Sequence, residues 1–401
     1  MTTAEAEHYF VIPLSVQKDG DDYLVGNAEI GDFYQFPEQG LKILQMLGSG
    51  KAPAAIKSRL ETEDGEKVDV DAFVELLSSI GFIHPESQKP YVLKRPQAAT
   101  QDQRTVFDVD PRFAKAVFSP PALFGYGCLV ALAAFEMIRD PALRINFNAF
   151  YTETNRTPLL LILMGFSILQ VTLHEVGHML AAAVHGIKSR YGFSNRLWSI
   201  VAESDLTALL SLPKSQRYLP MLAGLLVDVV CLSLLTMLLA VMLRNGAGPY
   251  AVQITQAFVL EIWIGMAWQC NIFLKTDIYF LLSNYFSYPD IDNEARVYIG
   301  NLTHRLTFGL FGRATSNSQP RNLLGVQIFA VIWLLGRIFS IFILLGVFLP
   351  TMARYLISAV GMLQGSSASI WMACDTIAYV AISLTMVGVG MYMWFNQSKR
   401  V

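Results

Sequence analysis

The stretch that decides the fold covers residues 158–184 and has the sequence PLLLILMGFSILQVTLHEVGHMLAAAV. Its only acidic or basic side chain besides two histidines is Glu175, and the run is longer than the roughly 20 apolar residues that a helix needs to cross a bilayer. The histidines, His174 and His178, stand near its C-terminal end. We therefore expect a membrane-spanning helix that carries a cluster of ionisable groups.

Apolar runs of similar length recur through residues 113–401. They predict six spans, at 120–138, 158–184, 218–243, 250–270, 325–349 and 369–395. Residues 351–363 are a weaker run, expected to form a short re-entrant or interfacial helix. The chain is 53% hydrophobic and only 15% charged, with a mean hydropathy of +0.40. These values predict a mostly α, polytopic membrane protein and disfavour a cytosolic enzyme, a disordered regulator and a nucleic-acid-binding protein.

The first 112 residues differ in composition from the rest. They hold 19 acidic and 11 basic side chains, a net charge of −8, whereas residues 113–401 have a net charge of +6. The segment 1–8 is polar and acidic, unlike a signal peptide, so we expect the N-terminal part to stay in the cytosol. Its acidity also argues against nucleic acid as a partner, because binding phosphate needs clustered Lys and Arg.

Residues 10–86 predict a small α+β, winged-helix-like domain. Two strands are expected at 10–18 and 23–36, joined by the turn Asp19–Gly20–Asp21–Asp22. Three helices are expected to follow, at 38–47, 53–60 and 69–80, with Asp69 as the N-cap of the third. The expected domains are therefore residues 1–86, a proline-containing linker at 87–112 and a membrane-embedded domain at 113–401.

The Lys and Arg content of the loops orients the spans. Loops 185–217 and 271–324 carry five basic residues each, whereas the loops expected outside carry three, one and one. Because basic loops stay inside, both termini are expected in the cytosol.

His174-Glu175-Val176-Gly177-His178 is an H-E-x-x-H motif inside an apolar helix. Residues four apart lie on one face of a helix, so both imidazoles can reach one metal ion. Zinc lowers the pKa of a bound water towards neutrality, and a neighbouring carboxylate can take its proton. Ionisable groups are costly inside a span, so a cluster of three indicates a function. The motif predicts zinc as cofactor, His174 and His178 as ligands, and Glu175 as the catalytic base.

A catalytic zinc usually takes a third protein ligand and keeps one position open. The metzincin spacing would place it at Val184, and His185 is expected to face the cytosolic loop. The best candidate is Asp277, just after the fourth span; the alternative is an ordinary interfacial carboxylate beside Lys275. Spans two and four both run from outside to inside, so Asp277 and the two histidines are expected at compatible depth near the cytosolic face.

Other ionisable residues fall inside the expected spans, and we expect them to pair within the bundle. They are Glu136, Asp228, Glu261, Arg337 and Asp375. One expected pair joins Arg337 to Glu261. Asp228 is the exception, expected to support the metal site from behind or to line the substrate path.

These residues resemble the site-2 protease family of intramembrane zinc metalloproteases. The closer resemblance, to its bacterial peptide zinc metalloprotease branch, is carried by residues 170–186, 213–228 and 271–277. The broader family has Asn-Pro before its third ligand and Gly after the Asp, where this chain has Asn271-Ile272 and Asp277-Ile278. Members of the branch often carry an N-terminal PqqD-like domain, which residues 10–86 resemble.

The resemblance implies a zinc-dependent endopeptidase in the bacterial inner (cytoplasmic) membrane, acting near the cytosolic face. Its substrate would be a peptide precursor or a membrane-associated segment, with peptide-modification or export proteins as partners. The PqqD-like domain would capture a peptide as an added strand on the edge of the 10–36 hairpin; the alternative is a passive cytosolic cap. The alternative function is a non-proteolytic, zinc-containing membrane protein for binding, maturation or export of a peptide.

The expected topology predicts a labelling pattern. A cysteine introduced in loop 271–324, or a reporter fused after Val401, should behave as cytosolic, because the basic loops stay inside. A cysteine at Asn245 should react with a membrane-impermeant thiol reagent added to intact cells. The opposite pattern would place the H-E-x-x-H motif near the outer face and contradict the depth argument.

Overall fold

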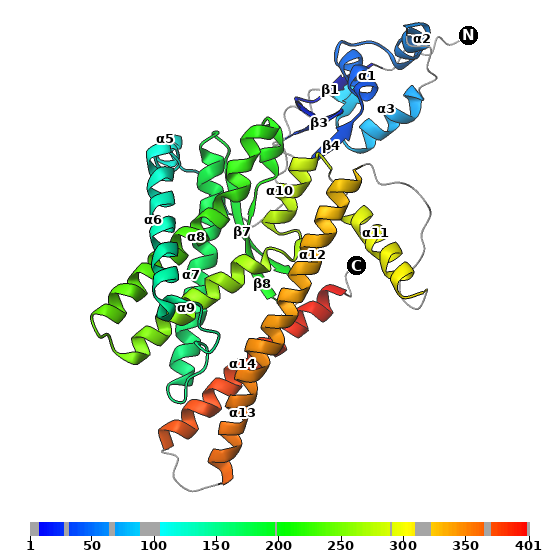
Figure 1. Cartoon of the computed structure of the whole chain (residues 1–401). Coiled ribbons are helices and arrows are strands. Elements are labelled where there is room, and N and C mark those ends of the chain that lie inside the picture. Colours follow the sequence, from blue (N-terminus) through cyan, green and yellow to red (C-terminus); the bar gives the residue numbers. More distant parts are fainter. Residues whose placement is uncertain are drawn as a thin grey trace. The chain divides into compact units, whose positions relative to one another are not determined.

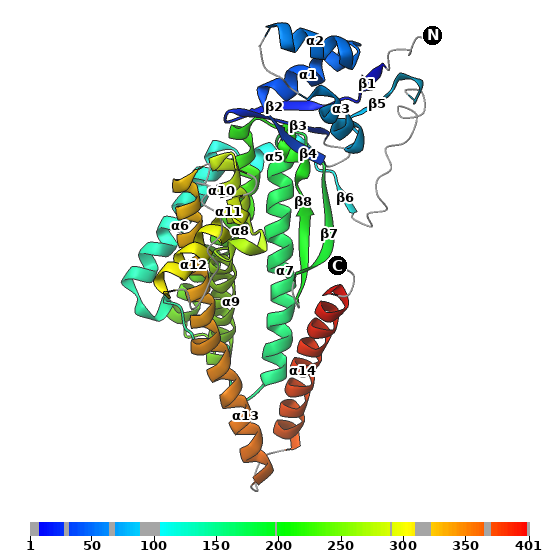
Figure 2. The same ribbon diagram turned by 90° about the vertical axis from the view of Figure 1, so that its right-hand side faces the viewer.

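The computed structural model describes residues 8–27, 32–63, 69–88, 105–196, 199–288, 291–308, 322–364 and 370–398. These residues are mostly helical, with three small sheets among them (Figures 1 and 2). The chain divides into two compact units. One unit contains residues 1–105 together with 205–218, and the other contains residues 106–204 and 219–401.

The N-terminal unit has more strands than the two that the sequence predicts. They are β1 (Tyr9–Val11), β2 (Ser15–Asp19), β3 (Asp22–Asn27), β4 (Asp32–Phe36) and β5 (Ile83–Pro85). Pro13 separates β1 from β2, because it has no N–H to donate to a ladder. β2 pairs with β3 across the expected turn, where Gly20 has a φ of 69°, and β4 pairs back on β3. β1 pairs with β5 instead.

Three helices complete this unit, α1 (Glu38–Gly48), α2 (Pro53–Glu63) and α3 (Val70–Ser79). The Asp69 side chain accepts the Ala72 N–H at 3.1 Å, which is the N-cap that the sequence predicts. The apolar faces of α1 and α3 close over the strands around a core that includes Leu47, Leu77 and Phe82. The short helix η1 (Glu86–Gln88) follows β5.

The second unit is built on long helices. They are α5 (Pro111–Val117), α6 (Pro120–Arg139), α7 (Arg156–Ala183), α8 (Lys214–Arg244), α9 (Pro249–Trp268), α10 (Asp277–Phe286), α11 (Ile291–Leu306), α12 (Leu323–Ile343), α13 (Leu349–Gln364) and α14 (Ile370–Ser398). The first turns of α8 group with the N-terminal unit.

Five helical stretches among the described residues are long and apolar enough to cross a membrane. They are Pro111–Arg139, Arg156–Ala183, Lys214–Arg244, Pro249–Trp268 and Leu323–Ile357. The sixth expected span falls on α14, where the apolar part found is the shorter stretch Ile370–Met386. Residues 351–363, which we expected to form a separate short re-entrant or interfacial helix, instead continue the preceding one, because the π-helical turn η5 (Leu344–Phe348) joins α12 to α13 without interruption.

A second feature that the sequence did not predict is a sheet of β6 (Thr105–Phe107), β7 (Ser189–Arg196) and β8 (Ser199–Asp205), in the order β6-β7-β8. β6 lies in the stretch expected to be a linker, and β7 and β8 lie in the loop expected after α7. Figure 2 shows β7 and β8 beside the C-terminal half of α7. The short helix η3 (Thr207–Ser211) then leads into α8.

Several buried charges in the helices find partners. Glu136 of α6 accepts a hydrogen bond from the Arg244 side chain at 2.6 Å. The expected pair between Arg337 and Glu261 is wrong, since Arg337 is exposed and its guanidinium lies 5.7 Å from the centroid of the Trp333 ring. The sequence therefore shows which charged residues of the helices need a partner, but it does not show which residue that partner is.

Asp375 of α14 caps the start of α7. Asn155, the residue before α7, has a φ of 57°, and its side chain makes no capping hydrogen bond. The Asp375 carboxylate instead accepts the N–H groups of Arg156 and Thr157, both at 2.9 Å. The Arg156 side chain donates to Thr376 one residue further on. A carboxylate at this position satisfies two amides and complements the positive end of the helix dipole.

Removing this cap should destabilise the helical unit. Asp375→Ala leaves both amides without their acceptor, and we expect the free energy of unfolding to fall by about 1–3 kcal/mol. The measurement is thermal unfolding of the detergent-solubilised chain. Cys374→Ala, which changes an exposed side chain next to Asp375, is the control and should leave the midpoint unchanged. Equal midpoints for both variants would show that the cap contributes nothing.

Candidate metal centre

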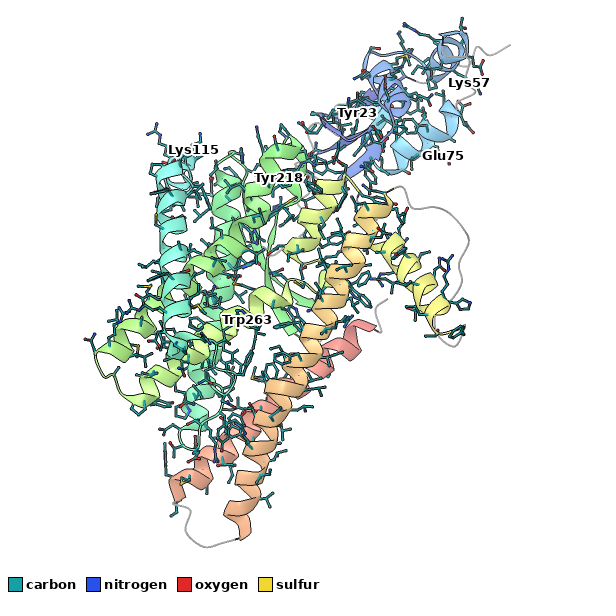
Figure 3. All side chains as sticks on the ribbon, viewed as in Figure 1. Tyr23, Lys57, Glu75, Lys115, Tyr218 and Trp263 are labelled. Atoms are coloured by element: carbon teal, nitrogen blue, oxygen red, sulfur yellow. The ribbon has the colours of Figure 1, made fainter. Side chains whose placement is uncertain are left out.

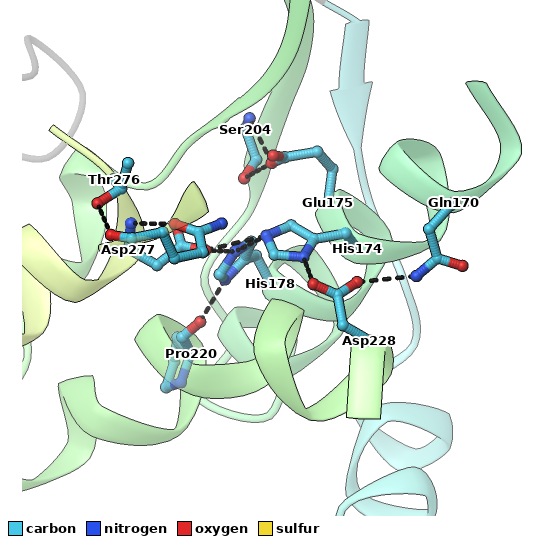
Figure 4. A network of polar contacts seen from close by, with 10 residues as sticks. Gln170, His174, Glu175, His178, Ser204, Pro220, Asp228, Thr276 and Asp277 are labelled. Carbon is cyan, nitrogen blue, oxygen red and sulfur yellow. Dashed lines mark hydrogen bonds and ion pairs between the residues drawn. The ribbon is translucent and has the colours of Figure 1, made fainter. Parts of the chain in front are cut away.

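His174, His178 and Asp277 come together in the second unit (Figure 4). Asp277 Oδ2 lies 2.9 Å from His174 Nε2 and 3.3 Å from His178 Nε2, and the two Nε2 atoms are 3.2 Å apart. Both histidines are buried on one face of α7, and Asp277 begins α10. Residues that are separated by about a hundred positions in the chain thus present three potential ligand atoms to one point.

The spacing of these atoms fits a tetrahedral zinc ion. Ligand atoms at about 2.0–2.1 Å from zinc, with tetrahedral angles, lie about 3.3 Å from one another. The three separations here are 2.9, 3.2 and 3.3 Å. Two imidazoles and one carboxylate are also a donor set that zinc accepts in catalytic sites. The described residues therefore fit the cofactor that the motif predicts.

The Nδ1 atom of each imidazole, the ring nitrogen that faces away from Asp277, has its own hydrogen-bond partner. His174 Nδ1 lies 2.8 Å from Asp228 Oδ2, and Gln170 donates to the other oxygen of Asp228 at 2.8 Å. His178 Nδ1 lies 2.7 Å from the carbonyl oxygen of Pro220. With Nδ1–H donating in both rings, both Nε2 lone pairs are directed to the same point as the Asp277 carboxylate. Three converging acceptors repel one another unless a cation or a proton lies between them.

Local structure places Asp277 at this point. The helical turn η4 (Ile272–Leu274) is followed by Lys275 with a φ of 54°, and the chain reverses there into α10. The Asp277 N–H donates to Gln269 Oε1 at 3.1 Å, and the Thr276 hydroxyl donates to the Gln269 carbonyl at 2.6 Å. Burial alone would raise the pKa of Asp277, but when the imidazoles of His174 and His178 carry protons on Nε2, their hydrogen bonds outweigh it and hold that pKa well below its usual range. Asp277 is then ionised beside protonated imidazoles, and a metal ion would take the place of their Nε2 protons.

Glu175 points to strand β8. Its Oε2 accepts two hydrogen bonds from Ser204, one from the backbone N–H at 2.8 Å and one from the hydroxyl at 2.6 Å. The neighbouring positions of His174 and Glu175 on α7 keep this carboxylate beside the metal centre, and Ser204 decides which way it faces. The sequence offered no sign of Ser204, because it lies in a loop that the apolar pattern leaves unassigned.

Two glycines let α7 and α8 approach closely at the centre. A Cβ on Gly177 would lie 2.7 Å from Val227 Cγ2 and 3.0 Å from the Ala223 carbonyl oxygen. A Cβ on Gly224 would lie 2.4 Å from His178 Nε2 and 2.5 Å from His174 Nε2. The hydrogen at Gly224 is thus the largest group that α8 can place against the two ligand nitrogens.

This contact gives a sharp test of the site. Gly224→Ala should abolish zinc binding, because the added methyl group occupies the space next to both Nε2 atoms. Gly165→Ala is the matched control, since a Cβ on Gly165 of α7 meets nothing within 4 Å. The measurement is the zinc content of both purified variants after equal exposure to the metal. Equal zinc content would contradict the placement of the metal between these residues.

No protein-family model, curated protein or solved structure matches the chain. The functional argument therefore depends on the geometry of these residues and on the motif that carries them.

Proposed function

We propose that this chain is a membrane-embedded zinc endopeptidase, with His174, His178 and Asp277 as metal ligands and Glu175 as catalytic base. The observation that carries the proposal is the convergence of three ligand atoms at zinc-like spacing, beside the glutamate of an H-E-x-x-H motif. The resemblance to the site-2 protease family supports the same assignment.

Bound zinc would supply Lewis acidity, which activates water and polarises the carbonyl of the scissile peptide bond. The residues of the chain then have distinct tasks. Asp228 and the Pro220 carbonyl hold the two imidazoles in the orientation that directs Nε2 inward. Glu175 takes the proton of the attacking water and passes it to the leaving amine, which requires its carboxylate to turn away from Ser204.

The surroundings favour a substrate within or beside the bilayer. Five helices are long and apolar enough to cross a membrane, and large apolar side chains face outward on them, among them Phe124, Ile138 and Ile168. A peptide precursor or a membrane-associated segment would reach the centre from the cytosolic side. We place the protein in the bacterial inner membrane with both termini in the cytosol, on the basis of the loop charges and the family resemblance.

The N-terminal domain is proposed to be PqqD-like and to capture the peptide, with peptide-modification or export proteins as partners. Its strands β2, β3 and β4 form a meander whose outer edges could accept an added strand.

One observation favours the alternative, a non-proteolytic protein that binds zinc for the maturation or export of a peptide. The Glu175 carboxylate is engaged by two donors from Ser204 rather than free beside the metal ligands. In that case the metal would serve structure, and Glu175 would attach β8 to α7.

Glu175→Gln separates the two functions. The amide cannot accept a proton from water, so the variant should keep stoichiometric zinc and lose at least about a hundredfold in peptide-bond hydrolysis. The assay is mass-spectrometric detection of fragments from a peptide library presented to the protein in lipid nanodiscs. No hydrolysis by either protein would favour the non-proteolytic alternative, and equal hydrolysis by both would contradict the assignment of Glu175 as catalytic base.

The ligand variants are the companion measurement. His174→Ala and His178→Ala should each lose zinc, and Asp277→Asn should retain it markedly less well, because a neutral amide is a poor ligand. Zinc bound at full stoichiometry by the double histidine variant would contradict the site itself.

A further inference from the structure

The segment Asp205–Tyr218 joins β8 to α8 and belongs to the same compact unit as residues 1–105. It includes η3 and the first turn of α8. The segment is braced internally, because Asp205 Oδ1 accepts both the N–H and the hydroxyl of Thr207, at 3.1 and 2.7 Å. Leu209 within it is almost fully buried. These contacts hold the segment together within the unit that contains residues 1–105.

The attachment is a buried ion pair with Arg217 at its centre. The Arg217 side chain is 1% exposed and that of Asp19 is 8% exposed, and Arg217 Nη1 lies 3.4 Å from Asp19 Oδ2. Arg217 also donates to the carbonyls of Leu212 and Leu210, at 2.9 and 3.2 Å. Asp19 ends strand β2 at the turn into β3. A guanidinium this buried needs its carboxylate, because an unpaired charge cannot be left in a dry environment.

A second contact attaches the same strand to the same segment. Gln17 of β2 donates to the carbonyl oxygen of Ser211 at 2.8 Å, and Ser15 donates to that oxygen at 3.4 Å. Strand β2 therefore holds the segment at two places, one ionic and one formed by neutral hydrogen bonds.

Both ends of the segment continue directly into supports of the metal centre. Ser204, the residue before it, donates twice to the Glu175 carboxylate. Pro220, two residues after it, accepts from His178. Because Arg217 and Pro220 are three residues apart on one helix, about one turn separates the ion pair from the carbonyl that orients a metal ligand.

We propose that Asp19 and Arg217 are positioning residues for the metal centre, and that the N-terminal domain regulates this centre through the segment 205–218. The inference rests on the proposed function, since it concerns the same ligands. A change in β2, such as that caused by a peptide added to the strands, shifts the segment and with it the groups that orient His178 and Glu175. The N-terminal domain is then a control element, in contrast to a passive cap.

The test uses the full chain in lipid nanodiscs and cobalt(II), whose visible spectrum reports the geometry of its ligands. Asp19→Asn and Gln17→Ala should each change the spectrum and weaken cobalt affinity by about twofold to thirtyfold, the range typical of coupling between sites. Asp71→Asn is the matched control. It breaks an exposed 3.3 Å pair with Lys57 on helices α2 and α3 of the same domain, and Figure 3 shows Lys57 well apart from Tyr23 in β3.

The outcomes are distinguishable. If the wild-type chain binds no cobalt, the proposed function fails. If the wild type binds cobalt and neither Asp19→Asn nor Gln17→Ala differs from it, the positioning role is overturned. An equal effect of Asp71→Asn would also overturn it, because any damage to the domain would then suffice. Should Asp19→Asn fail to fold, Gln17→Ala decides, since it removes only a neutral hydrogen bond.

Discussion

The close approach of α7 and α8 is the constraint on which the rest of the site depends. A Cβ on Gly177 or on Gly224 would collide with atoms of the facing helix, and Ala181 and Ala223 are fully buried beside them. Only at this separation can α8 present both the Asp228 carboxylate and the Pro220 carbonyl to imidazoles on α7. Pro220 contributes here by its backbone carbonyl oxygen, which has two lone pairs and accepts the hydrogen bond of His178. The small residues thus determine how the imidazoles of His174 and His178 are oriented.

Charged groups among apolar helices are tolerated here because each of those described at the centre belongs to a chain of contacts. Gln170 contacts Asp228, Asp228 contacts His174, and His174 meets Asp277. A protonated His174 between the two carboxylates would satisfy the same geometry, and metal binding distinguishes the two states. The pairs Asp375 with the start of α7 and Glu136 with Arg244 follow the same rule away from the centre. In a medium of low dielectric constant, partners for such groups are a requirement of folding as well as of function.

The segment 205–218 gives the N-terminal domain a physical connection to this chemistry. Its attachment to β2 involves a buried arginine, whereas its two ends lie next to residues that orient Glu175 and His178. Such a connection needs no additional ligand, because a displacement of β2 would pass along the covalent chain of the segment to Ser204 and Pro220.

The sequence by itself determined the local features of this protein. The apolar run at 158–184 predicts α7, and the four-residue spacing places both histidines on one face of that helix. Asp69 marks the start of α3, and Gly20 marks the turn between β2 and β3. The sequence carries these signals because each acts between near neighbours in the chain. His174, Glu175 and His178 could be named from the H-E-x-x-H motif, and Asp277 from its position just after the fourth expected span. Asp228 was singled out among the ionisable residues inside the spans. The tertiary structure alone decided that Ser204 faces Glu175, that Arg337 does not meet Glu261, and that β6 joins β7. Those contacts link residues far apart in sequence, and periodicity carries no information about which distant surfaces pack together.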